Sequence, residues 1–122
     1  CDFKVAAVLD PTGKTITSAK FPTRGDDLTL KLAATTKVLP KLRDWFPAAK
    51  IVGWKYELTG SRDDALEKAF AQIRSTRADA CVLNGAAYGP GFAFCAIQKD
   101  GPSRNELPTT EKLTSFLVDW LP

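Results

Sequence analysis

The chain has 122 residues, which is the size of one domain. Hydrophobic residues make up 44% and charged residues 25%, a composition that excludes disorder and fibrous repeats, and no apolar run reaches the ~20 residues of a membrane-spanning helix. The net charge of +3 is too small to indicate binding to nucleic acid. We therefore expect a globular protein with neither a membrane nor a nucleic acid as its partner.

The first elements in chain order are strands. Residues 3–9 form a nearly continuous apolar run that ends in a turn at Asp10, a pattern typical of a strand buried on both faces of a parallel sheet. Residues 15–21 and 27–32 are β-prone and are joined by a glycine-containing loop. They predict an antiparallel hairpin with one solvated face, which would form an arm.

A helix and a buried strand follow the hairpin. Apolar residues at helical spacing predict a helix that is capped by Thr35 or Thr36 and ended by Pro47. Pro40 then has to lie in or near the first helical turn, where proline is tolerated. Residues 50–56 predict a second buried strand.

The clearest helix covers residues 62–76. Ser61 and Asp64 form a capping box at its start, and one apolar stripe runs along its length. Residues 80–83 predict a third apolar strand, and a loop rich in glycine and alanine spans residues 84–91.

The chain ends with a strand at residues 92–98 and a helix capped by Thr109 or Thr110. Strands that alternate with helices favour the α/β class, here a partial Rossmann-like, mostly parallel sheet with flanking helices and a protruding β-hairpin arm. Only about three strands are central. We therefore expect residues 1–122 to be a single domain or the C-terminal half of a larger nucleotide-binding domain.

The three cysteines, Cys1, Cys81 and Cys95, indicate neither a disulfide framework nor a zinc site. Cys81 and Cys95 lie in apolar segments, so we interpret them as small buried hydrophobes rather than reactive thiols. The absence of histidine excludes His-dependent nucleophiles and His-ligated metals. A reducing, cytoplasmic compartment fits this composition. Methionine is also absent, so we expect a processed chain or a fragment.

Candidate site residues follow from the rule that ligands bind outside the carboxyl ends of strands in open α/β sheets. The rule selects Asp10, Trp54 to Tyr56, and Asn84 with Gly85. Each has a purely structural alternative, since Asp10 is a good turn residue, Trp54 suits a core and a glycine-rich loop often only connects strands. The loop also lacks the Lys-Ser/Thr of a P-loop.

An ordered set of short motifs runs through the whole chain. They are Ala6 to Asp10, Lys20 to Thr23, Gly25 to Leu30, Val52 to Trp54, Asp79 to Asn84, Gly91 with Phe92, and Glu106 to Pro108. In this order and spacing the chain resembles the C-terminal half of phosphopantothenate–cysteine ligase, an enzyme of coenzyme A biosynthesis that is often fused to a flavin-dependent decarboxylase.

The resemblance implies a reaction and its participants. The family activates the carboxylate of 4′-phosphopantothenate with CTP or ATP and magnesium, and the amine of cysteine then displaces the nucleotide. It implies a homodimer through residues 14–33, no flavin bound by this segment, no protein-held metal, and either a missing N-terminal half or a fused decarboxylase. Lys20 matches a catalytic lysine that stabilises the acyl-nucleotide. The nucleotide contacts it implies fall on Ala7, Asp10, Gly53, Trp54, Asn84 and Gly85.

This chain departs from the family pattern in its positive charges. Pro22 and Thr23 replace later lysines of the Lys20 segment, and two helix positions that are lysine in the family are neutral here, Gln72 and Thr76. Arg74 and Arg77 could substitute at the phosphates, although arginine and lysine are not interchangeable at a tuned site. We expect nucleotide binding to be weakened by several kcal/mol, at ~1.5–3 kcal/mol per charged hydrogen bond.

Three functions therefore compete. The chain is a ligase domain, a degenerate member of that family that binds a nucleotide or a partner without catalysis, or a dimerisation module. For the last, the hairpin arm and three exposed aromatic residues, Trp45, Phe46 and Trp120, would serve assembly alone.

Overall fold

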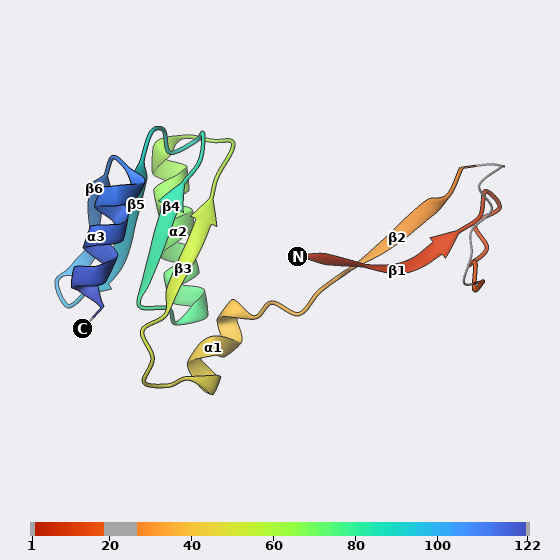
Figure 1. The fold of residues 1–122 in the computed structure, drawn as a ribbon, viewed down its shortest axis with the longest axis horizontal. Coiled ribbons are helices and arrows are strands. Elements are labelled where there is room, and N and C mark those ends of the chain that lie inside the picture. The colour runs from red at the N-terminus through yellow and green to blue at the C-terminus, as the bar shows by residue number, and fades with distance from the viewer. Residues whose placement is uncertain (1, 19–26, 122) are drawn as a thin grey trace. The chain divides into compact units, whose positions relative to one another are not determined.

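The structure is a computed structural model that describes residues 2–18 and 27–121. It divides into two compact units, residues 1–37 and residues 38–122, which are described separately. Figure 1 shows a two-stranded hairpin in the first unit and a four-stranded sheet with helices in the second.

The first unit is an antiparallel pair of strands, β1 (Phe3–Leu9) and β2 (Thr29–Ala34). The expectation that residues 3–9 form a buried strand of a parallel sheet is therefore wrong. The expected pairing of residues 15–21 with residues 27–32 is also wrong for its described part, since Thr15 forms an isolated bridge to Leu9 and β2 pairs with β1. An apolar run can equally form one strand of a hairpin whose apolar face is exposed.

A β-bulge between Val5 and Ala7 determines which side chains share a face of this hairpin. Before the bulge Phe3 pairs with Ala34 and Val5 with Leu32, and after it Val8 pairs with Leu30. Because opposite residues of a strand pair point to the same side, one face carries only apolar residues. We call it the apolar hairpin face; its members are Phe3, Val5, Val8, Leu30, Leu32 and Ala34.

The second unit follows an α/β order. Its elements are α1 (Leu39–Trp45), β3 (Val52–Tyr56), α2 (Arg62–Thr76), β4 (Ala80–Asn84), β5 (Phe92–Gln98), β6 (Gly101–Leu107) and α3 (Thr110–Trp120). The α/β class, the flanking helices and the separate hairpin are confirmed.

The sheet of the second unit has the order β3-β4-β5-β6 and is mixed. Only β3 and β4 are parallel, connected through α2, while β4–β5 and β5–β6 are antiparallel. The sheet is thus less parallel than expected, because a tight turn at residues 99–100 returns the chain directly into β6. Strand β6 was not predicted from the sequence.

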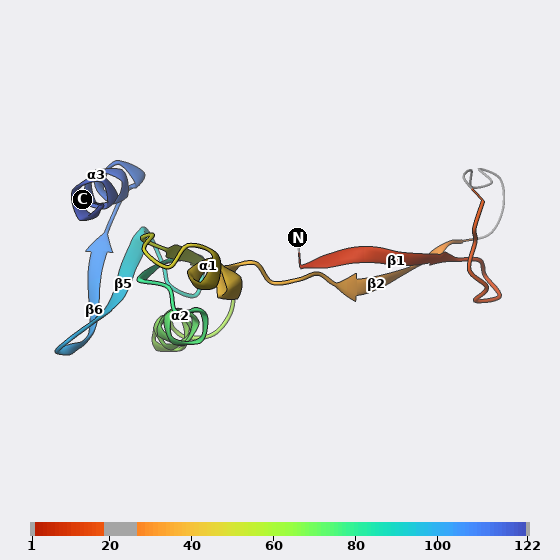
Figure 2. The same cartoon turned by 90° about the horizontal axis from the view of Figure 1, so that it is seen from below.

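Two helices cover opposite faces of the sheet, as Figure 2 shows. On one face α2 buries Leu66, Ala69 and Ile73 against Cys81, Leu83, Ala93 and Cys95. On the other, Phe116 and Trp120 of α3 pack against Phe94 at ring-centroid distances of 4.8 and 5.0 Å. Trp120 is therefore half-buried, in contrast to the expectation that it is exposed, whereas Trp45 and Phe46 are exposed.

The helix boundaries follow from their caps. The capping box of Ser61 and Asp64 and the N-cap Thr109 are confirmed. The expected cap of the first helix at Thr35 or Thr36 is wrong, since α1 begins after Val38, which makes no side-chain cap bond. Pro40 in the first turn supplies a fixed φ that replaces a cap. None of the helices within the described ranges is long and apolar enough to cross a membrane.

Candidate functional site

The structure brings Trp54 and Asn84 together. Indole Nε1 of Trp54 donates a hydrogen bond to Oδ1 of Asn84 at 2.9 Å. Trp54 lies in β3 opposite Val82, and Asn84 is the last residue of β4. The two strands run parallel, so the pair lies towards their carboxyl ends, where ligands bind in open α/β sheets.

The Trp54 ring is held in place yet remains accessible. Its edge contacts Phe92, with ring centroids 6.1 Å apart and an interplanar angle of 80°. The residue is 53% exposed. Side chains alternate along a strand, so Trp54 points to the same face as Val52, and Asn84 points to the same face as Val82. Val52 and Val82 both lie on the α3 side of the sheet. An exposed indole fixed at its edge can stack on a planar group such as a nucleobase.

Gly85 and Glu57 fix the loop that follows Asn84. The backbone N–H of Glu57 donates to the carbonyl of Asn84 at 2.9 Å, and Ala87 N–H donates to the carbonyl of Glu57 at 3.1 Å. Gly85 has a φ of 118°, and a Cβ at this position would collide with the backbone of Glu57. Glycine is therefore needed here for close backbone contact.

Glu57 was missed by the sequence analysis. Its carboxylate accepts hydrogen bonds from Lys68 Nζ at 2.5 Å and Lys55 Nζ at 3.1 Å, and its side chain is only 12% exposed. These two ammonium groups, Lys68 first, lower the pKa of Glu57 below its ordinary value. A carboxylate directly after an apolar strand, with lysines two and eleven positions away, was a signal that could have found it.

Gly53 lies on the other face of the sheet, towards α2. A Cβ on it would collide with Nε2 of Gln72, which itself donates weakly to the Cys81 sulfur at 3.7 Å. Thr76 is buried, and its hydroxyl donates to the carbonyl of Gln72 at 2.7 Å. The two neutral residues at the family's lysine positions thus serve packing within the unit.

Arg74 and Arg77 are not brought to Trp54 and Asn84. Arg74 pairs with Glu67 at 3.0 Å, and Arg77 pairs with Asp44 of α1 at 2.5 Å. Arg77 is the C-cap of α2 and precedes β4, so it lies at the amino end of that strand, whereas Asn84 lies at its carboxyl end. The five residues of β4 span roughly 16 Å at ~3.3 Å per residue.

Asp10 lies in the first unit and organises a turn. Its Oδ1 accepts hydrogen bonds from the Thr12 hydroxyl at 2.6 Å and from the backbone N–H groups of Thr12 and Lys14 at 2.9 Å each. These bonds, the Thr12 hydroxyl first, lower the pKa of Asp10. Ala7 lies three residues earlier in β1, opposite Lys31. The roles of Asp10 and Ala7 at a nucleotide remain predictions, and Lys20 lies outside the described residues.

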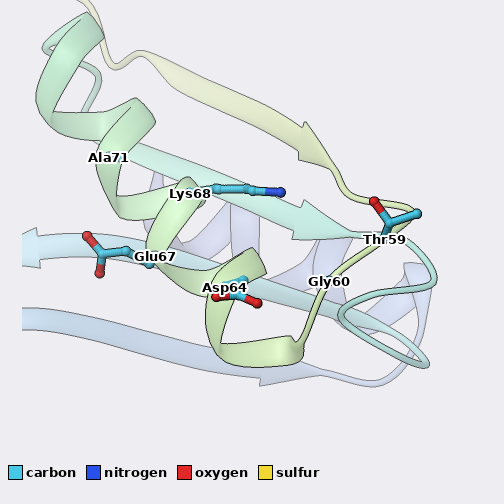
Figure 3. Close-up of a pocket in the computed structure, with 6 residues that line it drawn as sticks. All are labelled: Thr59, Gly60, Asp64, Glu67, Lys68 and Ala71. Atoms are coloured by element: carbon cyan, nitrogen blue, oxygen red, sulfur yellow. The ribbon is translucent and has the colours of Figure 1, made fainter.

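A hollow of about 470 Å³ beside α2 is not where the candidate residues gather. Figure 3 shows the residues that line it, Thr59, Gly60, Asp64, Glu67, Lys68 and Ala71. Asp64 is engaged in the capping box and Lys68 in the ion pair with Glu57. The carboxylates of Asp64 and Glu67 would repel a polyphosphate, and the ammonium group of Lys68 is already paired with Glu57. This hollow therefore does not suit a polyphosphate.

The cysteine interpretation is confirmed for Cys81 and Cys95. Both are free and fully buried, and they lie opposite each other in β4 and β5. Burial raises the pKa of Cys81 to about 12 and that of Cys95 to about 11. Thiols with such pKa values stay protonated at neutral pH and are poor nucleophiles.

Comparisons with known proteins bear on the fold. No family model matches the chain, and no curated protein matches it. Among solved structures, the chain is similar to the DNA/pantothenate metabolism flavoprotein from Streptococcus pneumoniae, with a TM-score of 0.73 and 16% identity, covering 98% of this chain and 57% of that one.

A histidine-to-alanine mutant of Cab2 is also similar. It has a TM-score of 0.54 at 15% identity, covering 93% of this chain and 35% of that one. The same mutant in complex with phosphopantothenate-cysteine has a TM-score of 0.56 at 15% identity, covering 98% of this chain and 42% of that one. The chain thus shares the fold of these proteins and spans only about a third to three fifths of their length.

Proposed function

We propose that this chain is the nucleotide-binding part of a phosphopantothenate–cysteine ligase-like protein. The observation that carries the proposal is the hydrogen-bonded pair of Trp54 and Asn84 towards the carboxyl ends of two parallel strands, in a fold shared with pantothenate-metabolism proteins. The exposed indole would stack on the base of CTP or ATP, and Gly85 would hold the loop beside the nucleotide through its close contact with Glu57.

The reaction would proceed in two displacements. The carboxylate oxygen of 4′-phosphopantothenate attacks the α-phosphorus of the nucleotide, and the bond to pyrophosphate breaks. The amine of cysteine then attacks the acyl carbon, loses a proton, and the bond to the nucleotide monophosphate breaks. Lys20 would stabilise the negative charge that develops on the phosphate and carboxylate oxygens.

Magnesium would enter this scheme with the nucleotide. Among residues 2–18 and 27–121, no three Cys, Asp or Glu side chains gather as metal ligands. A hard cation that keeps several waters and binds phosphate oxygens does not require such a cluster. The phosphates and water would supply most of the magnesium ligands, and Asp10 is the carboxylate that the resemblance assigns to the nucleotide.

Nucleotide binding is tested by calorimetric titration of the chain with CTP and with ATP in the presence of magnesium. We expect binding of at least one nucleotide, weakened at least about tenfold by Trp54→Ala through loss of base stacking. Trp45→Ala is the matched control, because Trp45 is equally exposed but lies in α1. Equal affinity in the wild type and Trp54→Ala would refute the assignment of this site.

Catalysis is a separate question from binding. Pyrophosphate release that depends on 4′-phosphopantothenate would support a ligase, and loss of that release in Lys20→Gln would support the role of Lys20. Nucleotide binding without pyrophosphate release would instead support the degenerate alternative, which the neutral packing of Gln72 and Thr76 favours.

The apolar hairpin face favours a homodimer through residues 14–33, which also agrees with a dimerisation module. Phe3, Val5, Leu30 and Leu32 are each more than half exposed, and an isolated two-stranded hairpin is marginally stable in water. Sedimentation should show a dimer that Leu30→Asp dissociates. Lys31→Asp, one residue away on the opposite face, should leave the dimer intact; dissociation by both variants would contradict the assigned face.

A further inference from the structure

A second hollow lies at the edge of the sheet where β5 begins and β6 ends. It has a volume of about 340 Å³ and is lined by Arg62, Tyr88, Pro90, Phe92, Glu106, Leu107 and Pro108. These residues come from the start of α2, the loop after β4, and the ends of β5 and β6. None of them belongs to the nucleotide contacts proposed above.

Arg62 is held over the hollow by three interactions. Its guanidinium carbon lies 4.6 Å from the centroid of the Tyr88 ring, and Nη2 donates to the Tyr88 hydroxyl at 3.1 Å and to Oε1 of Glu106 at 2.8 Å. Both hydrogen bonds use the same nitrogen. Within the described residues, Nη1 and Nε therefore keep their donors for a further acceptor.

The charge around the hollow favours an anion. Arg62 lines it with one positive charge, and Arg104 adds another at 3.7 Å from Oε1 of Glu106. Glu106 is the one carboxylate among the lining residues. Two guanidinium groups around one carboxylate leave a net positive charge, and an oxyanion is the ligand that the fork of an arginine matches best.

Part of the wall of the hollow is apolar and closely packed. Tyr88 is buried, and its hydroxyl donates to the carbonyl of Phe92 at 3.5 Å. Gly91, at a φ of 79°, packs so closely on Leu107 and Pro108 that a Cβ would contact their backbone at 2.7–3.2 Å. Pro90, Phe92 and Pro108 then offer an apolar surface beside the guanidinium, which suits the carbon part of an organic ligand.

We propose that this hollow binds a small organic anion, with Arg62 receiving its carboxylate or phosphate group and the surface of Phe92 and Pro108 its apolar body. Glu106 acts as an internal competitor, because it occupies one nitrogen of the guanidinium that the ligand approaches. Binding of the anion to this hollow does not require a nucleotide at Trp54 and Asn84. Phe92 also contacts Trp54, so the two sites share one side chain.

The test is an NMR titration of the whole chain with isobutyrate, phenyl phosphate and inorganic phosphate. Sodium chloride at matched ionic strength and neutral isobutyramide are the controls. We expect saturable shifts of the Arg62 Nε–H resonance and of the Tyr88 and Phe92 amides with the organic anions alone. Stronger binding of isobutyrate identifies a carboxylate ligand, and stronger binding of phenyl phosphate identifies a phosphate ligand. Saturation by inorganic phosphate alone would contradict the apolar subsite.

Variants separate this site from a general charge effect. Arg62→Gln should weaken binding at least about tenfold. Arg104→Gln removes a charge beside Glu106 that contributes to the field but does not line the hollow, so it should weaken binding only about twofold to threefold, well short of the effect of Arg62→Gln. Glu106→Gln should tighten binding about threefold by removing the competitor.

Two outcomes would overturn the proposal. One is shifts in the wild type that do not saturate or that sodium chloride reproduces. The other is equal affinity in the wild type and Arg62→Gln. Because the Arg62 resonance is followed in the wild type, the test does not depend on the variant being folded. A missing nucleotide response would refute the proposed function and leave this result unaffected.

Discussion

The two units of the chain place their apolar residues in opposite ways. In residues 38–122, side chains such as Leu83, Val82 and Phe94 are at most 1% exposed between two helices and a sheet. In the hairpin, Phe3 and Leu30 are 60% and 57% exposed. Apolar strands thus form a buried core in the second unit and an exposed face in the hairpin.

The difference shows where each unit obtains its stability. The second unit buries both faces of its sheet, so its own core can offset the entropy of folding. The described residues of the hairpin unit form one two-stranded sheet with an apolar face and include no helix. We proposed the dimer contact there because contacts in an assembly would supply the burial that the hairpin does not have of its own.

The largest expected effect comes from emptying the core of the second unit. Phe94→Ala should lower the free energy of unfolding by about 3–5 kcal/mol, because it leaves a cavity between Phe116 and Trp120. Leu30→Ala should lower it by less than about 1 kcal/mol. Urea unfolding followed by tryptophan fluorescence reports on the second unit alone, since all three tryptophans lie in it. Equal effects would show that the two units do not unfold independently.

Two glycines with positive φ give a smaller contrast. Gly85→Ala should destabilise the second unit by about 3 kcal/mol, since it adds backbone strain and a collision with Glu57. Gly13→Ala in the hairpin meets no atom within 4 Å and should cost only the strain, about 1 kcal/mol. Urea unfolding measures the effect of Gly85→Ala, and hydrogen exchange of the Thr12 and Lys14 amides measures the effect of Gly13→Ala. A harmless Gly85→Ala would contradict the close contact between the loop and Glu57.

The smallest contrast concerns two aspartates at acidic pH. Burial raises the pKa of Asp79, but hydrogen bonds from the Ile51 amide and Arg43 outweigh it and lower that pKa below 3.8. The stabilisation is therefore complete above pH ~4 and is lost as the pH falls through the folded-state pKa. Asp79→Asn should cost about 1 kcal/mol at pH 7 and less at pH 2, measured by urea unfolding.

Asp10 is the counterpart of Asp79 in the hairpin. Its lowered pKa arises in an exposed turn, so Asp10→Asn should leave the unfolding of the second unit unchanged at both pH values. Its effect should be confined to the amides of Thr12 and Lys14, which would lose protection from exchange. A change in the stability of the second unit would show that the turn supports it.

The parts of the fold that local patterns determine were predicted from the sequence. The capping box at Ser61 and the apolar stripe of α2 are short-range features, and both are present. The pairing of Trp54 with Asn84 followed from the rule that parallel strands end at one edge. Glu57 and the Arg62 hollow were missed because their members come from several separate elements.

Two errors about strands have physical reasons of the same kind. Strand β6 has a polar sequence that includes Pro102, and it forms as an edge strand through its pairing with β5. The apolar run of β1 did not reveal whether its partner would be parallel or antiparallel. For Arg74 and Arg77, the sequence gave their positions along the chain but not their ion-pair partners, Glu67 and Asp44, and their role at a nucleotide stays a prediction.

The bulge in β1 makes the apolar hairpin face sensitive to the number of residues in that strand. Side chains of a regular strand alternate between its two faces, so Val5 and Val8, three positions apart, would point to opposite faces. The extra residue at the bulge shifts this alternation by one and lets Phe3, Val5 and Val8 point to the same face. Deleting Ala6 would remove the bulge and leave Phe3, Val5 and Val8 in regular alternation on one side, whereas inserting one more residue beside Ala6 would turn Phe3 and Val5 to the side of Lys31. The apolar hairpin face therefore tolerates the loss of the extra residue in β1 but not the gain of a second one.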